Sequence, residues 1–197
     1  MQKLILIKHA APEVVPGVSS EQWRLSERGR ASCAALAEAL RAHGPKVIVS
    51  SEEPKASETA ELVAKQLGGE WTTAKNVHEH DRRGVPHMRS GEFISHVELM
   101  LRRRDERVLG HESADEALNR FRAALRDVLA KHPEQTVAVV AHGTVIALYV
   151  AEHTEDHTAF ELWRKLGLPS FVVMSRPELK VEQIVERIDP RGGGEIV

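Results

Sequence analysis

Two imidazoles and two amines each follow a short apolar run of the kind that forms a buried strand. Lys8 and His9 follow the first run, Lys55 opens a helical segment after the second, and His142 follows a later one. Ligands of open α/β sheets bind beyond the carboxyl ends of the strands, so these side chains are expected at one edge. Cations beside a helix N-terminus bind anions, and an imidazole can attack phosphorus. The pattern predicts a site for a phosphoryl group, whose transition state spreads charge over oxygens that such donors hold.

The elements that must position these residues alternate between strand and helix patterns. Strand patterns occur at residues 4–7, 47–49, 71–74, 137–140, 171–174 and 181–185. Helical patterns occur around residues 33–44, 54–67, 92–104, 113–128, 143–151 and 160–166, and residues 78–91 are expected to form a loop. This alternation predicts one α/β domain over residues 1–197, with a mostly parallel central sheet flanked by helices on both faces in three layers, α/β/α. A mobile C-terminal tail is expected from about residue 190.

Composition narrows the classes of protein. A length of 197 residues fits one domain, and a formal net charge of −2 gives no electrostatic reason to expect nucleic acid as a partner. Cys33 is the single cysteine, which excludes an internal disulfide and favours a reducing compartment. The apolar run at the N-terminus has four residues, too few for a signal peptide or a membrane span. A cytoplasmic protein with no membrane partner is expected.

Six segments follow the order of the signature motifs of the histidine phosphatase (phosphoglycerate-mutase-like) superfamily, which this sequence resembles. Residues 6–10 resemble its Arg-His-Gly signature, residues 25–29 its Leu-Thr-x-x-Gly, and residues 49–60 its Ser-Ser-Pro-x-x-Arg-Ala-x-x-Thr-Ala block. Residues 77–79 resemble its Leu-x-Glu acid loop, residues 110–113 its Gly-Glu-Ser element, and residues 139–143 its second histidine. The resemblance runs in order from about residue 4 to residue 151.

The resemblance implies the fold predicted above and a metal-independent phosphatase of the histidine acid type, with no cofactor. His9 would attack phosphorus and become phosphohistidine. His142 would hold the equatorial oxygens, across the phosphate from Lys8 and Lys55. Glu79 would give a proton to the leaving oxygen and then take one from the hydrolytic water. Hydrolysis of a phosphorylated small molecule or phosphopeptide is therefore expected, with the substrate and the oligomeric state left open.

Three positions depart from the family pattern. Lys8 and Lys55 stand where the family has paired arginines, and Ala10 stands for its usual glycine. Arginine forks onto two phosphate oxygens at once, whereas lysine is a compact point charge that binds without fixing orientation. A slower or more promiscuous enzyme is one expectation, and a catalytically weak phosphate-binding relative is another.

The proton donor is the least specific of these assignments. His78, Glu79, His80 and Asp81 are consecutive, and each has a side chain that could serve. Glu79 is preferred by its alignment to the acid loop. The same cluster also allows a metal-dependent hydrolase, because a His-x-His pair can bind zinc when further ligands converge on it.

Two further alternatives concern what happens to the phosphoryl group. A mutase must shield phosphohistidine from water, and family mutases carry a longer insertion after the acid loop than residues 79–112 provide. A binding module without chemistry is supported by the two lysine substitutions alone. Release of inorganic phosphate when no acceptor molecule is present would distinguish a hydrolase from a mutase and from a binding module.

Overall fold

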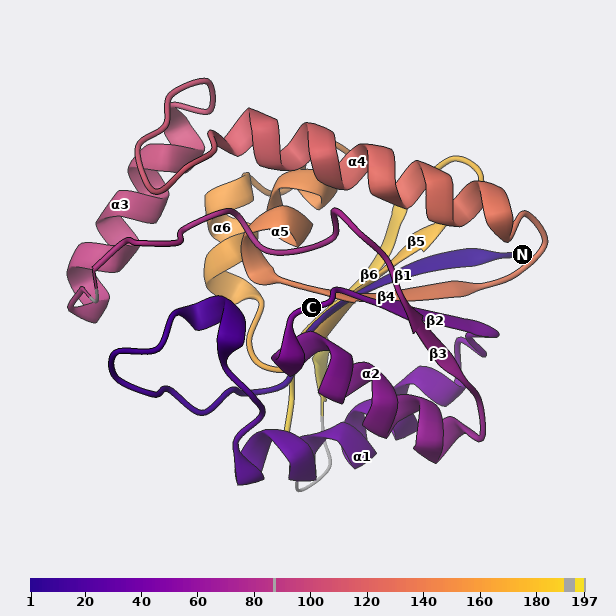
Figure 1. Cartoon of the computed structure of the whole chain (residues 1–197). Helices are drawn as coiled ribbons and strands as arrows, with labels where there is room; N and C mark the ends of the chain where they lie inside the picture. Colours follow the sequence, from indigo (N-terminus) through magenta and orange to yellow (C-terminus); the bar gives the residue numbers. More distant parts are fainter. Residues whose placement is uncertain (87, 190–193, 197) are drawn as a thin grey trace.

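Seven strands form one sheet in the order β3-β2-β4-β1-β5-β6-β7 (Figure 1). The computed structural model describes residues 1–86, 88–189 and 194–196 of the chain. The strands are β1 (Lys3–Lys8), β2 (Val47–Ser50), β3 (Trp71–Thr73), β4 (Val137–Ala141), β5 (Ser170–Ser175), β6 (Val181–Ile188) and β7 (Gly194–Ile196). β3, β2, β4 and β1 are mutually parallel, whereas β5, β6 and β7 extend the sheet by antiparallel pairing.

Helices cover both faces of this sheet, as Figure 1 shows. They are the 3-10 helix η1 (Ser20–Gln22), α1 (Glu27–Arg41), α2 (Pro54–Leu67), α3 (Ser90–Arg102), α4 (Ala114–Lys131), α5 (Gly143–Ala151) and α6 (Ala159–Lys165). Because successive strand residues point to opposite faces, β1 contributes Leu4 and Leu6 to the core under α3–α6. It contributes Ile5 and Ile7 to the core under α1 and α2. Burying each such side chain stabilises the fold by about 1.5–3 kcal/mol.

Helix ends follow local sequence signals. The capping box at the start of α4 is present in full: Ser113 accepts a hydrogen bond from the Glu116 N–H, and the Glu116 side chain accepts one from the Ser113 N–H. Pro54 occupies the first turn of α2, where its missing N–H costs no hydrogen bond. That helix ends at Gly68, whose φ of 71° lies in the left-handed region that glycine adopts most readily.

The predicted three-layer α/β domain is confirmed, with β1 to β4 parallel and β5 to β7 added by antiparallel pairing. The loop predicted over residues 78–91 is shorter, because α3 begins at Ser90. In the predicted C-terminal tail, residues 194–196 form β7 against β6. Residues 190–193 and 197 lie outside the described residues. No helix in the described part of the chain is both long and apolar enough to cross a membrane.

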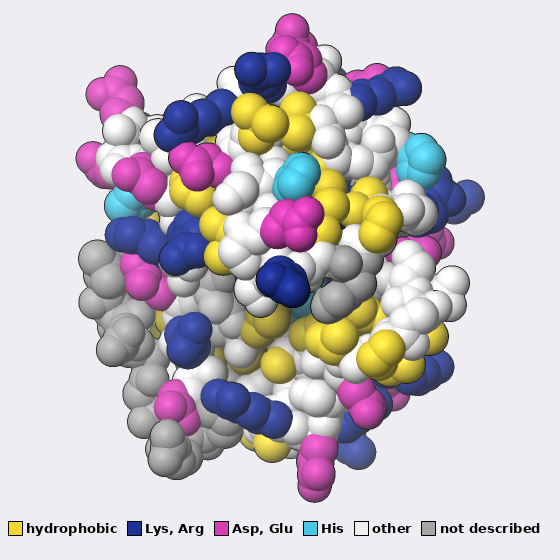
Figure 2. All heavy atoms as spheres, turned by 90° about the vertical axis from the view of Figure 1, so that its left-hand side faces the viewer, with side chains coloured by type: hydrophobic (Ala, Val, Ile, Leu, Met, Phe, Trp, Pro, Cys, Tyr) yellow, Lys and Arg dark blue, Asp and Glu magenta, His cyan; other side chains and the backbone are white. Residues whose placement is uncertain are grey.

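Figure 2 shows the face of the molecule that includes α3 and the loop after β1. Among the side chains drawn in colour on this face, cationic and acidic groups are interspersed with apolar ones. A protein that binds nucleic acid through its phosphates needs a continuous basic surface. The described side chains of this face do not form one.

Candidate active site

His9 and His142 lie side by side because the strands that precede them, β1 and β4, are parallel neighbours. The register places Lys8 opposite Ala141, and the His9 N–H donates to the Ala141 carbonyl over 3.1 Å. The two ring centroids are 5.2 Å apart. His9 is 6% exposed and His142 is 0% exposed. The sheet therefore brings together two imidazoles that are more than 130 residues apart in sequence.

The hydrogen bond of the His9 ring fixes its tautomer. Nδ1 lies 2.7 Å from the carbonyl oxygen of Ala10. Because a carbonyl only accepts, Nδ1 carries the proton and Nε2 of the neutral ring keeps its lone pair. Burial lowers the pKa of His9 well below 6.5, and the neighbouring His142 and Lys55 lower it further. His9 is therefore neutral at physiological pH, with a free nucleophilic nitrogen.

His142 is the N-cap residue of α5, so it stands where the backbone N–H groups of that helix begin. Burial lowers its pKa well below 6.5, and Lys55 lowers it further. Neither of its ring nitrogens forms a hydrogen bond to any residue that the structure describes. Buried polar atoms are almost always paired. Apart from a contact with the Glu53 carboxylate, this buried imidazole at a helix N-terminus keeps its ring nitrogens for a ligand.

Glu53, which the sequence analysis did not single out, places a carboxylate in the same site. Its Oε2 lies 2.5 Å from Nζ of Lys55. Its Oε1 lies 3.4 Å from Nε2 of His142 and accepts a hydrogen bond of 2.9 Å from the Glu79 N–H. Lys55 also donates to the Ser20 carbonyl over 2.6 Å. An incoming anion must therefore share Lys55 and His142 with an internal carboxylate.

Lys8 contacts the end of α6 and the start of α5. Its Nζ donates to the Leu166 carbonyl over 2.6 Å. A Cβ atom on Gly143, the residue after His142, would lie 3.1 Å from that nitrogen. The amine is therefore packed against the first turn of α5. Burial lowers the pKa of Lys8 from 10.5 to about 8, although Glu79 opposes this change.

Glu79 closes the site from the acid loop. Its Oε2 accepts a hydrogen bond of 3.1 Å from the Thr144 N–H in the first turn of α5, and its Oε1 accepts one of 2.9 Å from the His80 N–H. Burial raises its pKa, but the positive charge of Arg82 and these hydrogen bonds outweigh burial and lower the pKa from 4.5 to about 2. In the free protein Glu79 is a carboxylate, so it needs added negative charge nearby before it can donate a proton.

The neighbours of Glu79 are engaged elsewhere. His80 Nε2 lies 2.7 Å from the Glu112 carbonyl, and Asp81 forms a 2.5 Å ion pair with Arg83. Of the four candidates for proton donor, Glu79 is the one that contacts α5 beside His142. Within residues 1–86, 88–189 and 194–196, no three His, Cys, Asp or Glu side chains are grouped so that they could hold a metal ion.

Arg120 holds the acid loop in place, and the sequence analysis gave it no role. It donates to the carbonyls of Asn76, His78 and Glu79 over 2.9–3.2 Å. It also forms a 2.6 Å ion pair with Glu112, whose Oε1 accepts a further hydrogen bond from the Asp81 N–H. The Gly-His-Glu-Ser element and α4 thus fix the position of Glu79 through backbone contacts.

Gly110 allows this close approach. Its φ is 84°, and a Cβ atom there would lie 2.1 Å from the Asp81 carbonyl oxygen. Only glycine combines that conformation with that contact.

Thr59 on α2 fixes the backbone next to His9. Its hydroxyl accepts a hydrogen bond from the Ala10 N–H over 3.0 Å and donates one to the Lys55 carbonyl over 2.7 Å.

Comparisons with known proteins agree with this geometry. Residues 4–178 match the family described as histidine phosphatase superfamily (branch 1). A search of the curated proteins finds no match. Among solved structures, a mycobacterial glucosyl-3-phosphoglycerate phosphatase complexed with VO3 is 23% identical with a TM-score of 0.72, and the match covers 96% of this chain and 99% of that one.

Two further solved structures share the fold. YhfR of Bacillus stearothermophilus is 18% identical with a TM-score of 0.73, over 92% of this chain and 95% of that one. A mutant of the phosphoserine phosphatase of Entamoeba histolytica, in complex with phosphoserine, is 18% identical with a TM-score of 0.70, over 93% and 96% of the two chains. At these identities the likeness establishes the fold.

Proposed function

This chain belongs to the histidine phosphatase superfamily, branch 1, and from that membership we propose that it hydrolyses phosphomonoesters through a phosphohistidine on His9. The observation that supports this role most directly is the 5.2 Å separation of the ring centroids of His9 and His142. Two neutral, buried imidazoles at that separation can contact one phosphoryl group. His9 Nε2 has the free lone pair that attack on phosphorus requires.

In the first step Nε2 of His9 forms a bond to phosphorus while the bond from phosphorus to the leaving oxygen breaks. His142, Lys55, Lys8 and the N-terminus of α5 donate to the equatorial oxygens, where negative charge builds up. Lys55 and Lys8 supply the positive charge that a metal ion supplies in other phosphatases, so the reaction is proposed to need neither metal nor cofactor.

Proton transfer is assigned to Glu79. A bound phosphomonoester places up to about two negative charges beside this carboxylate, which raises its pKa and lets it carry a proton. Protonated Glu79 gives that proton to the leaving oxygen. In the second step the carboxylate takes a proton from water, whose oxygen attacks phosphorus as the bond from phosphorus to His9 breaks. Inorganic phosphate leaves and neutral His9 is restored.

The substrate is proposed to be a phosphorylated small molecule in the cytoplasm. Glucosyl-3-phosphoglycerate phosphatase and phosphoserine phosphatase, which share the fold, are named for small phosphomonoesters. The buried histidines favour a compact phosphomonoester over a phosphopeptide, because a peptide needs an open surface on both sides of the scissile group. The unpaired Cys33 agrees with a reducing compartment.

Phosphate release from p-nitrophenyl phosphate, with a chelator and no acceptor present, tests the proposal. We expect turnover by the wild type and a loss of at least about a thousandfold in His9→Ala. His132→Ala, a substitution at the C-terminal end of α4, is the matched control and should keep wild-type activity. An acid-labile phosphoryl label on the wild type that is missing from His9→Ala would identify the intermediate. Full turnover by His9→Ala would overturn the assignment.

A second candidate function is phosphate binding with little hydrolysis, which the ion pair between Glu53 and Lys55 favours. Such a protein would bind inorganic phosphate and release none from p-nitrophenyl phosphate. A mutase would form the same phosphohistidine but would transfer the group to an added acceptor faster than to water.

A further inference from the structure

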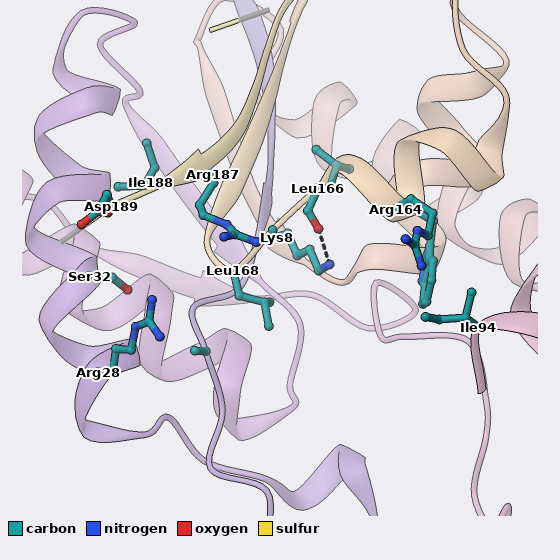
Figure 3. Close-up of a pocket in the computed structure, with 13 residues that line it drawn as sticks. Lys8, Arg28, Ser32, Ile94, Arg164, Leu166, Leu168, Arg187, Ile188 and Asp189 are labelled. Carbon is teal, nitrogen blue, oxygen red and sulfur yellow. Dashed lines mark hydrogen bonds between the residues drawn. The ribbon is translucent and has the colours of Figure 1, made fainter. Parts of the chain in front are cut away.

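A pocket of about 460 Å³ adjoins the candidate active site on the side of Lys8 (Figure 3). Lys8 lines it, as does Ala11, two residues after His9. Its remaining walls come from the start of α1, from α3, from α6 with the segment that leads to β5, and from the end of β6. The pocket therefore begins where the phosphoryl site ends, with the amine of Lys8 between them.

The charge of the pocket is predominantly positive. Arg28, Arg164 and Arg187 line it together with Lys8, and among the described lining residues Asp189 is the one acid. In Figure 3, Arg28 and Arg187 lie on one side and Arg164 on the other, with Lys8 between them. Asp189 has an interaction partner of its own. Three guanidinium groups and one amine therefore face a single carboxylate in the described lining, which favours an anionic ligand.

Arginine is the side chain best suited to bind a carboxylate or a phosphate, because its planar fork donates two hydrogen bonds to two oxygens at once. The pocket also has apolar walls from Ile94, Trp163 and Leu168, the last of which is 36% exposed. A ligand that fits is a short carbon skeleton with an anionic group at its far end. Inorganic phosphate alone would fill the adjacent site and leave the arginines uncontacted.

We propose that this pocket binds a second anionic group, a carboxylate or a further phosphate, on the same molecule whose phosphoryl group lies at His9. This assignment of substrate class rests on the proposed phosphatase function. Arg187 and Arg28 bind the second anion, and Leu168, which lies between Arg28 and Lys8 in Figure 3, packs against the carbon skeleton. The site at His9 would then accept the phosphoryl group of any phosphomonoester, and the arginine pocket would determine which phosphomonoesters are preferred.

Matched pairs of substrates test this selectivity. 3-Phosphoglycerate and glycerol 3-phosphate differ by a carboxylate in place of a hydroxymethyl group. Fructose 1,6-bisphosphate and fructose 6-phosphate differ by one phosphate. We expect the wild type to prefer the doubly anionic member of at least one pair by about tenfold or more in kcat/KM. The pair with the larger preference identifies which anion the pocket takes.

Arg187→Met and Arg28→Met should each lower that preference by about fivefold or more, because each removes a bidentate partner. Arg126→Met, an exposed arginine on α4, is the matched control and should keep the wild-type preference. A preference that is missing in the wild type, or that is unchanged in both pocket variants, would overturn the proposal.

Binding measured without turnover distinguishes failure of the pocket proposal from failure of the proposed phosphatase function. If the wild type releases no phosphate from p-nitrophenyl phosphate, the hydrolase assignment fails, and calorimetric titration with the same four compounds then tests the pocket alone. Tighter binding of a doubly anionic compound by the wild type, weakened in Arg187→Met, would support the pocket. Equal binding of both members of each pair would refute it.

Discussion

Replacing Glu53 by glutamine removes one charge from the centre of the site and keeps the shape of the side chain. Glu53 holds Lys55 at 2.5 Å and lies 3.4 Å from Nε2 of His142. Its side chain is 10% exposed, so water screens it little. If His9, Lys55 and His142 bind a phosphoryl group, this carboxylate opposes binding, and Glu53→Gln should bind phosphate more tightly.

The magnitude follows from the distances. A phosphate oxygen that accepts a hydrogen bond from Nε2 of His142 would lie within about 6 Å of Glu53 Oε1. At an effective dielectric constant of about 20, two unit charges about 6 Å apart repel by about 3 kcal/mol. Half of that, after relaxation of the site, corresponds to about tenfold in a dissociation constant. Freeing Lys55 for the ligand acts in the same direction.

The measurement is calorimetric titration with inorganic phosphate, together with KM for p-nitrophenyl phosphate. Both constants should fall about tenfold or more in Glu53→Gln. The matched control is Glu52→Gln, the same substitution one residue earlier at an exposed position, which should leave both constants unchanged. A folded Glu53→Gln protein that binds phosphate no more tightly than the wild type would refute the electrostatic reasoning.

Thermal unfolding provides an independent check on the same variant. Glu53→Gln leaves the buried amine of Lys55 with neutral acceptors only, the Ser20 carbonyl and the glutamine amide oxygen, and without an opposite charge. This should lower the free energy of unfolding by about 3 kcal/mol. Phosphate binds the folded state, so it should restore more stability to Glu53→Gln than to the wild type. An equal increase in Tm for both proteins would contradict the expected change in affinity.

Two further predictions concern Lys8 and Arg120. Because the pKa of Lys8 in the free protein is about 8, its charge is lost as pH rises through that value, so kcat/KM should fall on the alkaline side; Lys8→Arg keeps the charge and should remove that fall in a pH-rate profile. An unchanged alkaline limb in Lys8→Arg would assign it to another group. Arg120→Met releases the backbone of the acid loop, so kcat should fall about tenfold with KM little changed and amide exchange of Asp81 should accelerate. A change in Tm alone would reduce Arg120 to a purely structural residue.

The fold could be predicted because its signals are local. The uninterrupted apolar run from Leu4 to Ile7 indicates a strand with two buried faces, and β1 has cores on both sides. Ser113 and Glu116 form the capping box that their spacing predicts. Each of these signals spans a few residues and needs no knowledge of distant neighbours.

The site residues that the sequence analysis missed depend on contacts between distant segments. A glutamate just before Pro54 is ordinarily a solvated charge at a helix start; Glu53 points inward because the acid loop, 26 residues later, offers it the Glu79 N–H. Arg120 lies on a helix whose apolar face is predictable, but its role comes from three loop carbonyls more than 40 residues away. Side-chain direction at such positions is set by packing between segments, which periodicity does not encode.

The two lysines and the arginine pocket are connected through the energetics of catalysis. Lys55 is paired with Glu53 and Lys8 has a pKa of about 8, so the scissile phosphoryl group meets weaker, less directional cations than an arginine pair would supply. Binding energy from a remote part of a substrate can be used to orient the reacting group. A second anion held by Arg187 would supply that orientation from beyond Lys8. The proposed enzyme should therefore be slow with simple aryl phosphates. Combining Glu53→Gln with a doubly anionic substrate should raise kcat and lower KM.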